Sequence, residues 1–163
     1  MKSLTGTVAF VFLAACTASQ QATTSTATFT AADSSVIAGG IDRMVAAARA
    51  GKWDAWEAEY VADPVRYPPN APALVGKAAV GAFNRASPNF SAFDGKLTSV
   101  AGAGDLAVVT GTFAVSGPAG KDSKGKPTPA FHDEGSFMQI LRKQPAGSWK
   151  ITRDIWNSSL PAR

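Results

Sequence analysis

Residues 135–161 read GSFMQILRKQPAGSWKITRDIWNSSLP and contain two largely apolar runs separated by Pro145-Ala146-Gly147. β-Branched and aromatic side chains recur in both runs, and a short Pro/Gly segment between such runs is typical of a turn. The pattern predicts two adjacent strands, over residues 131–143 and 148–157. We therefore expect the domain to end in β-structure.

A second pair of strands is predicted immediately upstream, over residues 93–100 and 106–116. The connection between them reads AGAGD, which is typical of a hairpin. In the later strand both alternating sets of residues are apolar or Thr, so we expect both of its faces to be covered. Residues 116–130 contain three Gly, three Pro and three Lys and are expected to form a long exposed loop.

The first half of the chain has the spacing of helices. Asp33, Ser34 and Ser35 offer N-cap oxygens to a first helix, and Gly51 follows its predicted end. The apolar residues at helical spacing on this segment are Ile37, Ile41, Met44, Val45 and Ala48.

A short second helix is predicted after this one, with Asp54 near its start and Pro64 at its end. It carries Trp53, Trp56 and Tyr60. Residues 65–67 are predicted as a short strand, and residues 77–86 as a third helix.

Helices followed by an antiparallel meander predict an α+β domain with its helices on one face of the sheet. A chain of 163 residues is long enough for one such domain. We assign it to residues 33–163.

The first sixteen residues have the pattern of a secretion signal. Lys2 precedes an apolar stretch over residues 4–15, which is too short to span a bilayer. The stretch ends in Leu13-Ala14-Ala15-Cys16, which resembles the bacterial lipobox. The resemblance implies removal of residues 1–15 and a lipid on Cys16. An ordinary secretory signal is the alternative.

Residues 16–32 comprise this cysteine and an uncharged segment rich in Thr, Ala and Ser, which predicts a flexible tether. We thus expect a lipid-anchored protein of the bacterial cell envelope, with the membrane as a partner. Thr17, rather than Asp, follows Cys16. In enterobacteria-like sorting this implies the outer membrane, facing the periplasm.

Composition excludes several classes of protein. One cysteine and one histidine exclude a disulfide framework within the chain and a zinc cluster of Cys and His. The net charge of +4 is spread out, and Lys121, Lys124 and Lys126 are diluted by Asp122, so nucleic acid is not an expected partner. No Gly-rich phosphate loop is present, and no nucleotide or other cofactor is expected.

Two segments resemble a known family. Residues 53–83 read WDAWEAEYVADPVRYPPNAPALVGKAAVGAF, with an aromatic helix end, an acidic turn and a PPN segment, and residues 135–161 carry WKITRDIWN. They are similar to the nuclear transport factor 2-like superfamily, and within it to the SnoaL-like and ketosteroid-isomerase-like small domains. The chain departs from the family pattern at Ala62-Asp63, because many relatives carry two acids in succession at these positions. A role that depends on the first acid would be absent here.

The resemblance implies a cone: three N-terminal helices packed on the concave face of a strongly curved antiparallel sheet. It also implies a homodimer formed through the sheet. A bent sheet covered by helices leaves an apolar cavity for a ligand. The residues expected to line it are Trp56, Tyr60, Tyr67, Phe83, Phe113, His132, Asp154 and Trp156.

Two residues are candidate catalytic bases. Asp154 lies mid-strand and by strict alternation shares a face with Thr152 and Trp156. If that face is concave, Asp154 points into the pocket; if not, Arg153 does. His132 is expected to share a side with Glu134, and could relay protons at neutral pH. A structural ion pair for Asp154 and an exposed position for His132 are the alternatives.

Three functions fit these observations. The domain binds a small apolar or amphipathic molecule, or it is a cofactor-independent isomerase, dehydratase or cyclase that uses Asp154 or His132 as base. In the third interpretation it is an assembly protein that dimerises through its sheet. The fold hosts enzymes and binding proteins alike, and we favour the binding protein because the set of catalytic residues is small.

Overall fold

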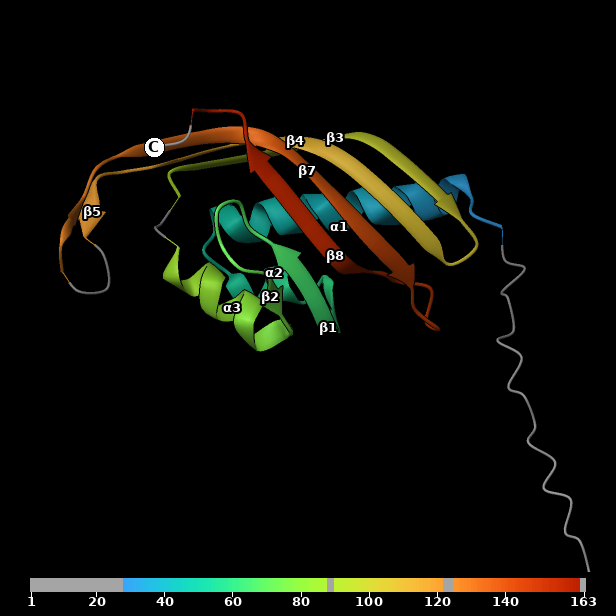
Figure 1. The fold of residues 1–163 in the computed structure, drawn as a ribbon. Helices are drawn as coiled ribbons and strands as arrows, with labels where there is room; N and C mark the ends of the chain where they lie inside the picture. Colours follow the sequence, from blue (N-terminus) through green and yellow to red (C-terminus); the bar gives the residue numbers. More distant parts are fainter. Residues whose placement is uncertain (1–27, 88–89, 122–124, 162–163) are drawn as a thin grey trace, which may run out of the picture.

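The computed structural model describes residues 28–87, 90–121 and 125–161 (Figure 1). The signal-like segment, Cys16 and the tether up to residue 27 lie outside the described residues. In the part that is described, no helix is long and apolar enough to cross a membrane.

A curved six-stranded sheet is the main element of the domain (Figure 1). Its strands lie in the order β2-β1-β8-β7-β4-β3, and all neighbours are antiparallel except β1 and β8, which are parallel. Figure 1 shows the sheet arching over α1. The α+β prediction, with helices on the concave face of a curved sheet, is confirmed. The elements are α1 Ala31–Arg49, α2 Trp53–Glu57, β1 Tyr60–Tyr67, β2 Leu74–Val75, α3 Lys77–Ala86, β3 Ala92–Ala103, β4 Leu106–Gly117, β5 Gly120–Lys121, β6 Pro127–Thr128, β7 Phe131–Lys143 and β8 Trp149–Ser158.

The first helix begins earlier than its sequence suggested. Thr30 is the N-cap, and Asp33 is the third helical residue of a capping box in which the two side chains satisfy each other's backbone N–H groups. Asp33 therefore caps from inside the helix, and not from the position before it. Phe29 packs edge-on against Trp149, with ring centroids 5.6 Å apart, so ordered structure extends into the predicted tether.

The second helix is shorter than predicted, because Tyr60 belongs to a strand. Helix α2 ends at Glu57, and the next residues pair with β8: the Ile151 N–H donates to the Glu59 carbonyl at 2.9 Å. Pro64 lies within β1, where the register to β8 shifts between Tyr60 and Val65. Because Pro has no N–H to donate, it fits at such an irregular position. The third helix, α3, has the predicted bounds.

The strands of the C-terminal half match the predictions closely, with two exceptions. Within the predicted loop, β5 and β6 form a small separate pair. The outer face of β4 is less covered than expected: Ala107 and Val109 are buried on the inner face, but Leu106 is 39% exposed.

A β-bulge in β8 changes which side chains face the helices. Ile140 pairs with Arg153 and Leu141 with Ile151, so Thr152 has no partner on β7. The extra residue offsets the strict alternation, and Ile151 lies in the core on the same side as Asp154. The prediction that Thr152 shares a face of the sheet with Asp154, and that Ile151 lies on the opposite face, is therefore wrong. The prediction that Trp156 shares the face of Asp154 is confirmed, and this face is the concave one.

Candidate binding pocket

The concave side of the sheet borders an open cavity of about 370 Å³, lined by the three helices and by strands β1, β3, β4, β7 and β8. This volume lies within the range of small-molecule sites, which are mostly apolar with a few polar groups. The aromatic residues that line it are Trp53, Trp56, Phe83, Phe90, Phe93, Phe113, Phe131, Phe137 and Trp156.

Five of the eight residues expected to line this cavity do so: Trp56, Phe83, Phe113, Asp154 and Trp156. Tyr60 does not line it, because its buried ring belongs to the core between the sheet and α1. Tyr67 does not line it either and is 41% exposed at the end of β1.

Asp154 lies at the polar end of the cavity and is 3% exposed. Its Oδ2 accepts hydrogen bonds from the Tyr60 hydroxyl at 2.5 Å and from Arg66 Nε at 3.0 Å. Its Oδ1 accepts a bond from Gln139 Nε2 at 3.3 Å. A carboxylate offers about four lone-pair positions, so these three donors leave about one. Asp154 thus points into the pocket and is also held in an ion pair. By sequence alone these two positions are alternatives, and in the structure both hold.

Arg66 is the counter-charge of Asp154, and sequence analysis did not single it out. Its Nη1 donates to Asn84 Oδ1 at 2.6 Å, and its guanidinium lies 4.2 Å from the ring centroid of Trp156. Phe83 and Trp56 lie within 6 Å of the same group. Aromatic faces and a carboxylate together compensate a cation removed from water. The residue pattern of β1 does not predict that Arg66 is buried in an ion pair, because its hydrogen-bond partners come from α3 and β8.

The Tyr60 hydroxyl remains protonated across the physiological pH range. Burial raises its pKa well above the ordinary value, and the negative charge of Asp154 raises it further. Tyr60 therefore acts as a hydrogen-bond donor that orients the carboxylate of Asp154 from outside the cavity.

His132 lies outside the lining of the cavity. Its side chain is 52% exposed, its Nδ1 lies 3.1 Å from Ser116 Oγ, and its Nε2 lies 3.6 Å from Glu134 Oε2. The prediction that His132 and Glu134 share a side is confirmed. Asp133, between them, faces the opposite way and lines the cavity, where its Oδ1 accepts a bond from Ser158 Oγ at 2.6 Å.

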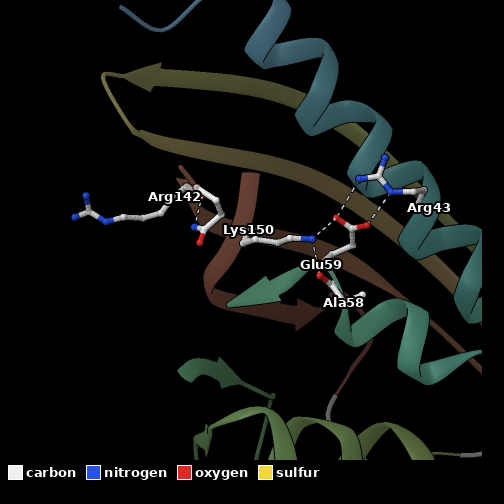
Figure 2. Close-up of polar contacts among 6 residues, drawn as sticks. Arg43, Ala58, Glu59, Arg142 and Lys150 are labelled. Atoms are coloured by element: carbon white, nitrogen blue, oxygen red, sulfur yellow. Dashed lines mark hydrogen bonds and ion pairs between the residues drawn. The ribbon is translucent and has the colours of Figure 1, made fainter. Parts of the chain in front are cut away.

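A second buried carboxylate, Glu59, belongs to the scaffold rather than to the cavity (Figure 2). Arg43 on α1 donates to its two oxygens at 2.7 and 3.1 Å, which raises the pKa of the guanidinium. Lys150 on β8 lies 3.8 Å from Glu59 and donates to the Ala58 carbonyl at 2.6 Å. Figure 2 shows Arg142 pointing away from this group. The network connects α1, the start of β1 and β8, and so supports the wall behind the pocket.

No group of three or more His, Cys, Asp or Glu residues in the described chain could hold a metal ion. The polar end of the cavity is instead built from one ion pair and two amides, Asn84 and Gln139. Such a set can bind and orient a polar group, and Asp154 retains one position that could accept a proton.

The model of the SnoaL-like domain family matches residues 41–149. The chain belongs to this family. No curated protein matches the sequence.

Solved structures similar to this SnoaL-like domain share its fold. A ketosteroid isomerase-like protein from Erwinia carotovora atroseptica is 23% identical, with a TM-score of 0.62 over 78% of this chain and 96% of that one. A nuclear transport factor 2-like superfamily protein from Salmonella enterica serovar Typhimurium is 18% identical, with a TM-score of 0.62 over 83% and 95% of the chains. A nuclear transport factor 2-like protein with a cystatin-like fold from Novosphingobium aromaticivorans is also 18% identical, with a TM-score of 0.62 over 80% and 84%.

The departure of this SnoaL-like domain at Ala62-Asp63 falls on an exposed part of β1. Neither residue lines the cavity. The carboxylates that do line it are Asp133 and Asp154, which come from β7 and β8.

Proposed function

We propose that the protein binds a small apolar or amphipathic molecule in the cavity beneath its curved sheet. The observation that supports this most directly is a space of about 370 Å³ whose wall is largely aromatic and includes one hydrogen-bonded polar group, formed by Arg66, Asn84, Gln139 and Asp154. Native cores are close-packed, and voids much larger than a water molecule are few. A cavity of this size is the expected form of a ligand site.

Binding of the neutral fluorescent probe N-phenyl-1-naphthylamine tests this function. Val115, 8% exposed, lines the cavity, so Val115→Phe places additional atoms in the space. We expect this variant to weaken probe binding at least tenfold. Ile155→Phe, on the convex face where Ile155 is 49% exposed, is the matched control and should bind as the wild type does. Equal affinity of all three proteins, or no binding by the wild type, would contradict the proposal.

Proton transfer is a second candidate, favoured by the position of Asp154. Its carboxylate faces the cavity and has about one unoccupied acceptor position, which a substrate C–H next to a carbonyl could approach. An isomerase, dehydratase or cyclase acting through this group would lose its activity in Asp154→Asn. His132→Gln should have little effect, since His132 does not line the cavity. Activity that survives Asp154→Asn would exclude this mechanism.

We place this function at the envelope, because Leu13-Ala14-Ala15-Cys16 has the pattern of a lipidation site. The lipid would hold the pocket near the outer membrane. Cys16→Ser should then release the full-length protein into the soluble fraction of lysed cells, and a variant that stays in the membrane fraction would argue against a lipid anchor.

A further inference from the structure

The charges around the cavity determine what ligand charge it accepts. Among the described residues that line it, the ionisable side chains are Arg66, Asp133 and Asp154. Arg66 and Asp154 form an ion pair at 3.0 Å and compensate each other, which leaves the carboxylate of Asp133. An anionic ligand would therefore enter an apolar space that holds no uncompensated cation, at a cost in desolvation.

Three buried polar atoms on residues that line the cavity have no hydrogen-bond partner in the described structure: Trp56 Nε1, Asn84 Nδ2 and Gln139 Oε1. Asn84 is 4% exposed and Gln139 5%, and both residues line the cavity. The orientations of these two amides follow from their neighbours. Arg66 can only donate, so the oxygen of Asn84 must face it; the carboxylate of Asp154 accepts, so the nitrogen of Gln139 must face it.

The two unpaired amide atoms are thus one donor and one acceptor, and the indole N–H of Trp56 is a second donor. A buried polar group without a partner costs free energy, and nearly all such groups in native proteins have one. A ligand that supplies an acceptor to Asn84 and a donor to Gln139 would satisfy both amides. Ordered water is the alternative partner.

We propose that the ligand of this pocket is a neutral, ring-containing molecule whose polar end carries a hydrogen-bond acceptor for Asn84 Nδ2 and a donor for Gln139 Oε1, as a carboxamide does. The proposal rests on the binding function above and specifies its chemistry. The aromatic wall packs against the ring, and the two amides select the polar end. The Asp133 carboxylate, which also lines the cavity, disfavours a negative charge within it.

Three naphthalene compounds of similar shape separate the possibilities. Naphthalene lacks polar groups, 2-naphthamide is neutral with one acceptor and two N–H donors, and 2-naphthoate is an anion. Their dissociation constants are measured by displacement of N-phenyl-1-naphthylamine from the wild-type protein at pH 7.5. We expect 2-naphthamide to bind about tenfold more tightly than either of the others, since two net hydrogen bonds account for a factor of that order.

Asn84→Asp tests the donor separately. The change keeps an oxygen for Arg66 and replaces the free N–H₂ by an acceptor, so the preference for 2-naphthamide over naphthalene should fall to less than threefold. Asn157→Asp adds the same charge at an exposed position of β8 and should keep the preference. If Asn84→Asp does not fold, as judged by circular dichroism, the wild-type ranking decides.

Each other outcome is informative. Equal binding of naphthalene and 2-naphthamide would overturn the proposal and indicate water as the partner of the two amides. Tighter binding of 2-naphthoate would overturn it in favour of an anion site at Arg66. Failure of all three compounds to displace a bound probe would overturn the proposed ligand class and leave the binding function intact. Failure of the probe itself to bind would overturn both.

Discussion

The residues that decide the chemistry of this pocket are Asp154 and Arg66. Their side chains are 4% and 11% exposed, so each charge depends on the other for compensation. Trp156 stacks on the guanidinium, and Tyr60 orients the carboxylate. The pair is therefore part of the folded scaffold as well as of the binding site.

Removal of the negative charge should destabilise the protein. Asp154→Asn leaves the Arg66 guanidinium buried without a counter-ion, which typically costs about 3–5 kcal/mol. Urea unfolding followed by tryptophan fluorescence measures the change. The control is Glu134→Gln. Because the Glu134 side chain is 54% exposed, this change should alter the free energy of unfolding by less than about 0.5 kcal/mol. Equal unfolding midpoints for wild type and Asp154→Asn would show that the aromatic cage alone stabilises Arg66.

At the scale of elements, the start of α1 is fastened to the end of the sheet through Asp33. Its carboxylate accepts bonds from the N-cap residue Thr30, from Trp149 Nε1 at 3.0 Å and from Lys143 Nζ at 2.7 Å. These contacts, the Lys143 contact above all, hold the pKa of Asp33 well below its usual value. The capping-box residue Asp33 therefore also binds the start of α1 to β7 and β8.

This arrangement predicts a pH dependence of stability. Because the pKa of Asp33 is lower in the folded state than in the unfolded state, its contribution is complete above a pH of about 4 and is lost as the pH falls further. The Tm of the wild type should therefore decrease more between pH 5 and pH 2.5 than the Tm of Asp33→Asn, measured by differential scanning calorimetry. Parallel decreases in the two proteins would show that Asp33 does not contribute.

Local patterns predicted most elements, and the two errors in β1 and β8 have a common cause. Helix α3 and strand β7 have the predicted bounds, because periodicity and flanking Pro or Gly residues are local signals. Tyr60 was placed in a helix because its spacing from Trp56 fits one. It lies in β1 because the backbone there pairs with β8, about ninety residues away in sequence. The bulge at Thr152 is likewise a property of the pairing with β7.

At the scale of the molecule, the convex face of the sheet carries exposed apolar side chains. Met138 is 47% and Ile155 is 49% exposed, and the two are direct neighbours on β7 and β8. Both alternate with residues that line the cavity, so they face away from the helices. This face is the one through which the resemblance to the family implies a homodimer.

Dimer formation through this face can be tested by a single substitution that introduces a charged side chain there. Met138→Glu should convert a dimer into a monomer in sedimentation equilibrium, because the carboxylate would be buried against an apolar partner surface. Val75→Glu, at an edge position that is 69% exposed, should leave the association unchanged. A wild-type domain that stays monomeric at high concentration would show that the expectation is wrong.

The sequence by itself determined the class of the fold, the family, four of the nine aromatic residues on the cavity wall and the presence of Asp154 on the face of Trp156. These follow from local periodicity and from motifs, which need no knowledge of distant contacts. The tertiary structure alone decided that Arg66 faces Asp154, that His132 and Tyr67 lie away from the cavity, and that Asn84 and Gln139 present a donor and an acceptor there. The physical reason is that each of these depends on side chains brought together from separate elements, and a buried charge or amide is specified by its partners.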